Sequence, residues 1–232
     1  MFKFRELNKT TYEMLINGEL WCATPKSLND PFDAQFDYEA FGQRASFSTE
    51  NDDYAKYLAR TAHDLFENMG ICSFSKDSSN QVMWSHYADE HRGLCIEFDI
   101  SKVLELNSEL SLAPVTYQSE LPESQLVKTY EPTNEALYVS SVVDKSVFLK
   151  ILATKDLTWS YEQEVRIIKP EYGVIKFTPE CIVSISFGLR ASHRDINSVR
   201  RLLSNNVYSH IKWRKARKSK VTYSLEFEAI EI

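Results

Sequence analysis

Residues 159–168 constrain the fold more than any other stretch, because they combine a strong backbone preference with a regular pattern of charges. Trp, Tyr, Val and two adjacent Ile residues favour an extended, half-buried backbone and predict a strand. Residues two apart on a strand point to the same face, so Glu162, Glu164 and Arg166 are predicted to share one face. Two interpretations stay open here: a solvated strand face with a local Glu–Arg pair, or a catalytic Glu-x-Glu.

The composition allows a substantial core, since 43% of the 232 residues are hydrophobic. Only six glycines and seven prolines occur, and neither a flexible linker nor an internal repeat is visible in the sequence. We therefore expect one domain over residues 1–232, with a basic strand pair over about residues 206–232. The net charge of −6 argues against a general nucleic-acid coat but allows a local basic patch.

The cysteines, Cys22, Cys72, Cys95 and Cys181, each lie in an apolar setting and include no C-x-x-C pair. This pattern indicates small buried hydrophobic residues and not a zinc or disulfide framework. The N-terminus has no apolar signal sequence, and no apolar run reaches the length that spans a membrane. We expect a reduced, cytoplasmic protein without a membrane partner.

Periodicity predicts an α+β fold, with mixed but mainly antiparallel β-sheets flanked by helices. Strand patterns cover residues 2–5, 19–23, 71–75, 93–99, 114–117, 173–177, 181–188, 208–215 and 221–232. Helical spacing covers residues 9–17, 50–68, 81–89, 101–106, 136–152 and 192–203, and residues 121–133 are expected to be a polar loop. Gly18 is a candidate cap at the end of the first helix, and Ser192 with Asp195 resembles a capping box for the last.

The segment Leu-Asn-Asp-Pro-Phe-Asp at residues 28–33 interrupts these patterns. Proline moves Asp30 out of the helical region, and the Asn29 side chain can bond its own backbone, so a turn is the first interpretation. A polar loop beside a ligand pocket is the alternative. Asp30, Asp33 and Glu97 are possible metal ligands by type, but nothing in their spacing brings them together, and no metal site is predicted.

Three polar groups of residues remain once familiar motifs are excluded. The chain has no phosphate-binding glycine loop, no H-E-x-x-H and no G-x-S-x-G. Each remaining group lies on a predicted strand or at its end: Arg5 on the first strand, Ser73 and Ser75 on a middle one, and Glu162 and Glu164 on a late one.

This order resembles the Arg, Ser-x-Ser, Glu-x-Glu pattern of ADP-ribosyltransferases. The resemblance implies an ADP-ribosyltransferase-like fold, NAD as substrate and no metal. Cleavage of the bond between nicotinamide and ribose develops an oxocarbenium-like cation, as in glycoside hydrolysis. The resemblance implies that Glu164 stabilises this cation and that Glu162 orients or deprotonates the acceptor.

The same resemblance implies roles for the residues expected to bind NAD. Arg5 would contact the dinucleotide, since a guanidinium can bind phosphate oxygens in bidentate fashion. Ser73 and Ser75 would brace the cleft or the glutamate by hydrogen bonds. Tyr87 would stack on nicotinamide, and His86 would add a polar contact. The plainer interpretations are a local Arg5 ion pair, ordinary strand serines and a structural histidine.

A second resemblance rests on three longer motifs: Leu-Asn-Asp-Pro-Phe at 28–32, Met-Trp-Ser-His-Tyr-Ala at 83–88 and Trp-Ser-Tyr-Glu-Gln-Glu-Val-Arg-Ile at 159–167. Together these motifs resemble the bacterial domain of unknown function 2971 family, over nearly the whole chain. Members of that family often occur among phage-defence and mobile genes.

Residues 212–220 hold the most concentrated positive charge in the chain. A solvated hairpin whose lysines discourage edge pairing is one interpretation. Contact with RNA or DNA phosphates, with an aromatic ring stacked on a base, is the other. The residues expected to make that contact are Lys212, Trp213, Arg214, Lys215, Arg217 and Lys218.

The leading functional hypothesis is a NAD-dependent ADP-ribosyltransferase-like effector, such as a phage-defence toxin that modifies nucleic acid or protein and has a cognate antitoxin. One alternative is a non-catalytic binding or sensor component of a defence or toxin–antitoxin system. Another is a NAD glycohydrolase, which would transfer ADP-ribose to water. The sequence leaves the acceptor open.

Overall fold

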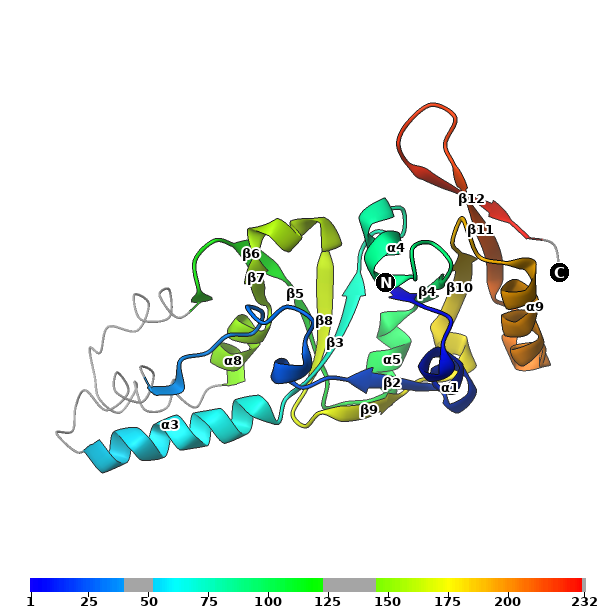
Figure 1. Ribbon diagram of the computed structural model, residues 1–232. Helices are drawn as coiled ribbons and strands as arrows, with labels where there is room; N and C mark the ends of the chain where they lie inside the picture. Colours follow the sequence, from blue (N-terminus) through cyan, green and yellow to red (C-terminus); the bar gives the residue numbers. More distant parts are fainter. Residues whose placement is uncertain (40–51, 123–144, 231–232) are drawn as a thin grey trace.

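The computed structural model describes residues 1–39, 52–122 and 145–230 (Figure 1). Its main sheet has eight strands in the order β12-β11-β10-β4-β1-β3-β8-β5. In chain order these are β1 (Phe2–Arg5), β3 (Gly70–Ser75), β4 (Leu94–Phe98), β5 (Ser111–Pro114), β8 (Glu164–Lys169), β10 (Ile182–Phe187), β11 (Lys212–Lys218) and β12 (Leu225–Ala229). All pairs are antiparallel except β10–β11.

Two small sheets accompany the main one: antiparallel β2 (Glu19–Cys22) with β9 (Gly173–Lys176), and parallel β6 (Thr116–Gln118) with β7 (Thr154–Asp156). The α-helices are α1 (Lys9–Asn17), α3 (Asp52–Glu67), α4 (Gln81–Tyr87), α5 (Ile100–Leu106), α8 (Lys145–Leu152) and α9 (His193–Leu202). Short 3-10 helices are η1 (Pro25–Ser27), η2 (Leu157–Glu162), η3 (Pro179–Cys181) and η4 (Asn206–Tyr208). The prediction of an α+β fold with mainly antiparallel sheets is confirmed.

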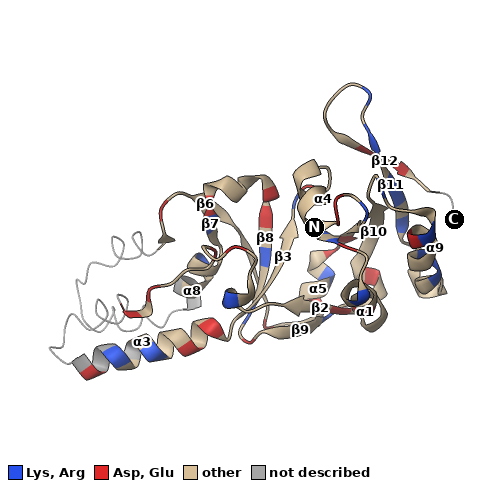
Figure 2. Ribbon diagram, viewed as in Figure 1, with Lys and Arg blue, Asp and Glu red and all other residues tan. Residues whose placement is uncertain are grey.

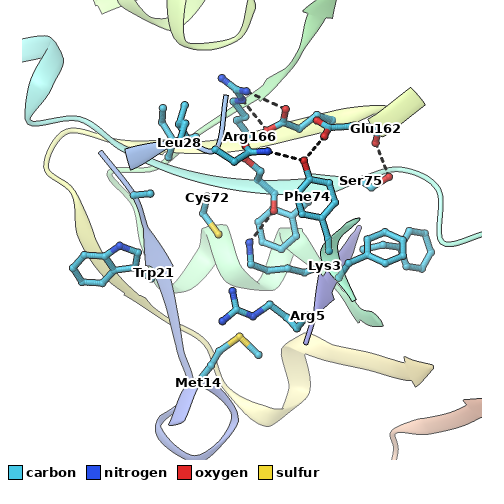
Figure 3. A pocket seen from close by; sticks show the side chains of 18 of the residues that line it. Lys3, Arg5, Met14, Trp21, Leu28, Cys72, Phe74, Ser75, Glu162 and Arg166 are labelled. Carbon is cyan, nitrogen blue, oxygen red and sulfur yellow. Dashed lines mark hydrogen bonds and ion pairs between the residues drawn. The ribbon is translucent and has the colours of Figure 1, made fainter. Parts of the chain in front are cut away.

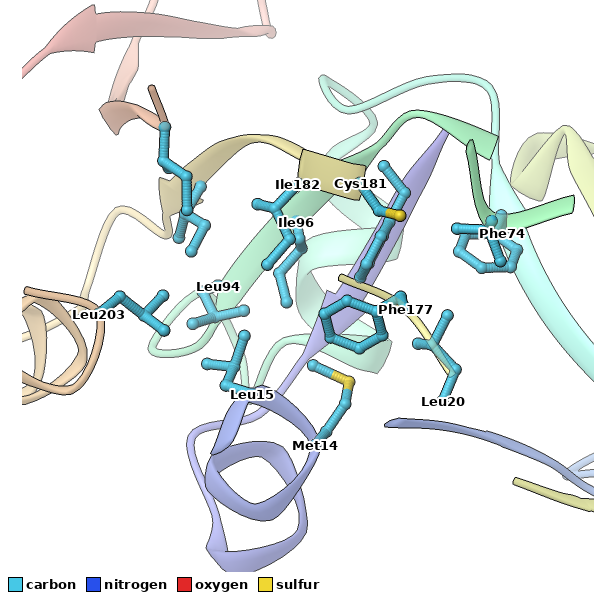
Figure 4. Close-up of a cluster of buried hydrophobic side chains, with 14 of the residues drawn as sticks. Met14, Leu15, Leu20, Phe74, Leu94, Ile96, Phe177, Cys181, Ile182 and Leu203 are labelled. Carbon is cyan, nitrogen blue, oxygen red and sulfur yellow. The ribbon is translucent and has the colours of Figure 1, made fainter. Parts of the chain in front are cut away.

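Strand β4 shows how the main sheet separates two parts of the core. Leu94, Ile96 and Phe98 point into the largest apolar cluster, which also contains buried residues of α1, α5 and α9 (Figure 4). Cys95, between them, points to the opposite face and packs in a cluster with Trp84 of α4. A third cluster joins α3 and α8 to β3 and β8, and Figure 1 shows these helices at the end of the sheet away from the β11–β12 hairpin.

Strands β1 and β3 are neighbours in the sheet but diverge almost at once. A single register pair, Phe2 opposite Ser75, joins them. Beyond that pair, the Lys3 ammonium donates to the backbone carbonyl of Ser73 at 2.9 Å, where a continuing strand would have placed an amide. The divergence opens the sheet at its centre, and this opening positions the site described below.

Capping residues fix two helices where the sequence predicts them. Helix α1 ends at Gly18, whose φ of 62° is the left-handed conformation that glycine adopts readily. Helix α9 begins after Ser192, whose Oγ accepts a hydrogen bond from the Asp195 amide at 3.1 Å. Both caps are confirmed.

The predicted strand over residues 159–168 is wrong in its first half. Residues up to Glu162 form the 3-10 helix η2, which starts where Asp156 accepts a hydrogen bond from the Thr158 amide. Gln163 follows with φ 46°, a left-handed conformation that cannot belong to a strand, and β8 begins only at Glu164. Glu162 is therefore not on the same strand face as Glu164 and Arg166.

Other boundaries differ less. Strand β11 starts at Lys212 and not at residue 208, because η4 occupies the segment before it. The predicted polar loop over 121–133 and the first part of the predicted helix over 136–152 lie almost wholly outside the described residues, as do residues 50–51 and 231–232. In the part of the chain that is described, no helix has the length and apolar character that crossing a membrane requires.

Candidate active site

A cavity of about 490 Å³ lies at the divergence of β1 and β3 (Figure 3). Six of the residues predicted from the sequence line it: Arg5, Ser73, Ser75, Tyr87, Glu162 and Glu164. They come from β1, from β3, from the end of α4, and from η2 and β8. The structure therefore brings the arginine, the serine pair and the glutamate pair to one cavity.

Strand alternation gives this cavity two different ends. Ser73 lies directly opposite Arg166 in the β3–β8 register, and Ser75 lies opposite Glu164, so these side chains share one face. Lys3 and Arg5 belong to the face of the sheet that also carries Phe74, and the Lys3 ammonium lies 5.1 Å from the Phe74 ring centroid. One end of the cavity is accordingly rich in carboxylates and the other is cationic.

Glu164 and Arg166 form a bidentate ion pair at the carboxylate end of the cavity. The Arg166 Nε donates to Glu164 Oε1 at 2.8 Å, and the Arg166 Nη2 donates to Oε2 at 3.0 Å. The same guanidinium donates to both carboxylate oxygens of Asp33, at 2.9 and 2.5 Å. Asp33 belongs to the 28–33 segment, which is thereby bound to strand β8.

Lys155 lies among three carboxylates. Its Nζ is 2.7 Å from Glu162 Oε2, 3.5 Å from Glu164 Oε2 and 3.6 Å from Asp33 Oδ2. It also lies 4.8 Å from the centroid of the Trp159 ring. The residue comes from β7, immediately before η2, so its position depends on the same local turn that places Glu162.

Glu162 has a second set of partners on α4 and β3. The Tyr87 hydroxyl donates to Glu162 Oε1 at 2.6 Å, and Asn29 Nδ2 donates to the Tyr87 hydroxyl at 2.9 Å. The Ser75 Oγ donates to the Glu162 backbone carbonyl at 2.7 Å. Ser75 therefore braces the backbone of the glutamate, whereas Tyr87 orients its carboxylate.

The pKa shifts follow from burial opposed by charge. Burial would raise the pKa of Glu164, but Arg166 and Lys155, with a contribution from Ser73, outweigh burial and lower that pKa to about 2. Burial would lower the pKa values of Arg166 and Lys155, but the surrounding carboxylates raise both. Burial and the hydrogen bond to Glu162 raise the pKa of Tyr87. Both basic groups are thus charged at neutral pH, and Tyr87 is a neutral donor.

The charges of this cluster do not cancel. Asp33, Glu162 and Glu164 contribute three formal negative charges, and Lys155 and Arg166 contribute two positive ones, which leaves −1. Each of these five residues is at most 6% exposed. The residual charge is screened less at such buried positions than at a protein surface, so it favours a cation at this end of the cavity.

Arg5 is the main feature of the cationic end. Its Nε donates to Thr11 Oγ1 at 3.2 Å, and among the described residues its two terminal nitrogens have no hydrogen-bond or ion-pair partner. Figure 3 shows the guanidinium between Met14 and Lys3, with Trp21 on the far side of the cavity. Trp21 also lines the cavity although it is 59% exposed. This end offers free guanidinium donors beside an accessible aromatic ring.

His86 and the basic residues of 212–220 are not among the residues that line the cavity. His86 is exposed on α4, where its Nδ1 is 3.4 Å from the Tyr161 hydroxyl, and it is not among the residues that line the cavity. Tyr87 contacts Glu162 through its hydroxyl, so the expected stacking on nicotinamide would have to coexist with that hydrogen bond.

The prediction that Trp213 stacks on a base is wrong. Its side chain is buried, and its ring stacks on Phe187 with centroids 6.1 Å apart and planes 10° apart. The Lys215 ammonium donates to a backbone carbonyl at 2.6 Å, and Arg217 pairs with two glutamates of β12. Figure 2 shows these opposite charges on neighbouring strands. Of the six residues expected there, Lys212, Arg217 and Lys218 are exposed, and Arg214 and Lys215 are half-buried.

Several residues of the site were not predicted from the sequence. No sequence pattern points to Lys155, Trp21 lies on a predicted strand without a predicted role, and Asp33 is a possible metal ligand only by residue type. The turn at 28–33 is present, but Asp30 and not Asn29 bonds the local backbone, by accepting from the Phe32 amide at 2.9 Å. The interruption by Asn-Asp-Pro was the one sequence signal that this segment borders a pocket, and Asn29 does line the cavity.

The described residues contain no group of three or more His, Cys, Asp or Glu side chains arranged to hold a metal ion. The three carboxylates of the cavity pair instead with Lys155 and Arg166.

No curated protein and no solved structure matches this chain. A family model does match, and the match covers residues 83–167, a shorter stretch than the motifs at 28–32, 83–88 and 159–167 had indicated. Within it lie most of helix α4 and the glutamate pair of the cavity. The family is described as a protein of unknown function (DUF2971), and residues 83–167 of this chain match its model.

Proposed function

We propose that this protein binds NAD in the cavity and cleaves the bond between nicotinamide and ribose, as an ADP-ribosyltransferase-like enzyme. One observation carries the proposal: the Arg, Ser-x-Ser and Glu-x-Glu residues line a single cavity whose two ends carry opposite charge. β1, β3 and β8, which carry most of these residues, are consecutive in the sheet.

The charge distribution of NAD matches that of the cavity. Its pyrophosphate is anionic and suits the free guanidinium donors of Arg5, which can contact two phosphate oxygens at once. Its nicotinamide ring is cationic and suits the end where the buried cluster has a formal charge of −1. A dinucleotide would therefore lie with its phosphates towards β1 and its nicotinamide ribose towards Glu162 and Glu164.

The same cluster suits the chemical step. Nicotinamide leaves with the electron pair of the C–N bond, and positive charge moves onto the ribose. Fixed carboxylates beside the ribose stabilise that charge more strongly in a buried site than in water. Glu164 is held by Arg166 in one geometry, and Tyr87 and Lys155 hold Glu162, so little reorganisation is required as the cation forms.

The acceptor completes the reaction by forming a bond to the ribose carbon and giving up a proton. We propose that Glu162, which ends η2 just before β8 begins, accepts this proton. Nucleic acid or protein as acceptor gives a transferase, and water gives a NAD glycohydrolase. The exposed Lys212 and Lys218 of β11 support nucleic acid, since phosphates bind to surface cations. On the resemblance to a family found among phage-defence genes, we propose an effector role with a cognate antitoxin.

Nicotinamide release from NAD tests the proposal. We expect release by the wild type, with labelling of an acceptor or with free ADP-ribose. Glu162→Gln should lower the rate by about 100-fold or more, because it removes a carboxylate while preserving the shape of the side chain. Glu105→Gln, at an exposed position of α5, is the matched control and should react like the wild type. Absence of release with RNA, DNA, protein and water alike, or full activity of Glu162→Gln, would contradict the proposal.

A second candidate is a non-catalytic binding or sensor component. The hydrogen bonding of Glu164 favours this second candidate, because Arg166 already contacts both oxygens of that carboxylate. This candidate requires that Glu162→Gln leave activity in cells intact, whereas replacement of Lys212 and Lys218 abolishes it. The enzyme proposal requires the opposite result for Glu162→Gln.

A further inference from the structure

Two cysteines face each other in the cavity wall. Ala23 and Ile71 form an isolated antiparallel bridge between β2 and β3, with both backbone hydrogen bonds at 2.8 Å. In this register the next pair along the strands is Cys22 opposite Cys72, a pair that exchanges no backbone hydrogen bonds. Such pairs have Cα atoms about 4.5 Å apart, within the range of about 4.4–6.8 Å that a disulfide spans.

The two thiols also interact directly. A hydrogen bond between Cys22 and Cys72 lowers the pKa of Cys72 and raises that of Cys22. Burial opposes the change at Cys72, but the nearby Lys3 and Arg5 support it. The lowered pKa makes Cys72 the better nucleophile of the two thiols.

Their surroundings distinguish this pair from the remaining cysteines. Cys72 lines the cavity, and Figure 3 shows its sulfur pointing towards the side where Arg5 and Trp21 lie. Cys22 is fully buried and does not line the cavity. Cys95 and Cys181 are also buried, but they do not line the cavity, and burial raises the pKa of Cys95 well above its usual value.

We propose that Cys72 and Cys22 are an oxidation-sensitive pair that a hydroperoxide converts to a cross-strand disulfide. The Cys72 thiolate attacks the peroxide oxygen, the O–O bond breaks, and the alkoxide that leaves takes up a proton. The Cys22 sulfur then attacks the Cys72 sulfenic acid, and the hydroxyl leaves as water with the Cys22 proton. In sum, two thiols and one hydroperoxide give one disulfide, one alcohol and one water. The disulfide would tie β2 to β3 in the wall of the cavity.

Peptide mass spectrometry of the intact, folded chain tests this inference. The wild type is treated with tert-butyl hydroperoxide, denatured, alkylated without reductant and digested. We expect a linked peptide that contains Cys22 and Cys72, with Cys95 and Cys181 alkylated. Cys22→Ala should instead accumulate a sulfenic acid on Cys72 that dimedone traps, and Cys95→Ala, the matched control, should still form the disulfide.

Complete alkylation of all cysteines after peroxide treatment would overturn the inference, and so would a linkage that joins any other pair. The result is read on the wild-type chain, so a variant that fails to fold does not affect it. It requires no NAD, so its failure is distinct from failure of the proposed function.

Discussion

Lys155 is the residue on which the carboxylate end of the cavity depends. Three carboxylates lie 2.7 to 3.6 Å from its ammonium group, and the side chain is 3% exposed. Buried ion pairs add little net stability compared with apolar residues of the same shape, but loss of one partner leaves the other charges uncompensated. The cluster is therefore sensitive to any change that alters its net charge.

Lys155→Met tests this sensitivity. Methionine approximately preserves the shape and removes the charge, which changes the formal charge of the cluster from −1 to −2. We expect the free energy of unfolding to fall by about 3–5 kcal/mol in urea titrations. Lys102→Met is the control, because the exposed Lys102 Nζ lies 3.9 Å from Asp99 Oδ2. It should lower the free energy of unfolding by about 1 kcal/mol or less. Equal losses in both variants would contradict the account.

Acid titration tests the state of Glu164. Its pKa is lowered from 4.5 to about 2 in the folded protein, so the carboxylate stabilises the fold above about pH 4.5 and loses that effect as the pH falls towards 2. The expected loss over this window is on the order of 3 kcal/mol. In urea titrations Glu164→Gln should be less stable at pH 7 and should show a smaller change over the same window. The same pH slope in the variant as in the wild type would refute the assignment.

At the level of single residues, the sequence predicted the side chains whose position follows from strand alternation. The alternating pattern of β1 and β3 predicts which way Arg5, Ser73 and Ser75 face, and all three line the cavity. Asp33 reaches Arg166 only through a tertiary contact across 133 residues of chain. Lys155 precedes Glu164 by nine residues, and the turn of η2 brings its ammonium to that carboxylate. No local pattern carries that information.

At the scale of elements, the site depends on a short helix and a diverging pair of strands. Strand β8 begins one residue after Gln163, whose left-handed conformation turns the chain and places Glu162 beside Tyr87. Composition alone favoured a strand throughout this stretch, since its aromatic and branched residues have high strand propensity. Hydrogen bonding by Asp156 and the turn at Gln163 override that propensity, and neither was visible in the apolar pattern.

Helix caps are the elements that the sequence located best, and Ser192 offers a direct test. Ser192→Ala removes the acceptor for the Asp195 amide and should lower the free energy of unfolding by about 1 kcal/mol. Ser192→Asp should retain most of the stability, because a carboxylate can accept the same bond and favours a helix N-terminus. Ser198→Ala, at an exposed interior position of α9, is the control, and its stability in thermal unfolding should stay within about 0.5 kcal/mol of wild type. Equal losses of stability in Ser192→Ala and Ser198→Ala would contradict the capping role of Ser192.

At the scale of the whole molecule, the main sheet carries the cavity at its centre and a hairpin at one edge. Its centre opens into the cavity between β1 and β3, whereas its β11–β12 edge carries a hairpin that Figure 1 shows projecting from the rest of the fold. The sequence predicted the α+β class and most of the strands, because apolar periodicity determines both. It did not predict the strand order or the divergence at Phe2, which depend on pairing between distant segments.

The affinity of the cavity for NAD⁺ relative to NADH tests the central claim most directly. The two share the pyrophosphate and the adenosine, but only NAD⁺ has a positive charge on the nicotinamide ring. If the cluster of net charge −1 faces that ring, calorimetry should give NAD⁺ a Kd at least about tenfold lower, a difference of about 1.4 kcal/mol. Glu162→Gln should reduce this preference, and Glu105→Gln should retain it. Equal affinity for both dinucleotides, or binding of neither, would contradict the account.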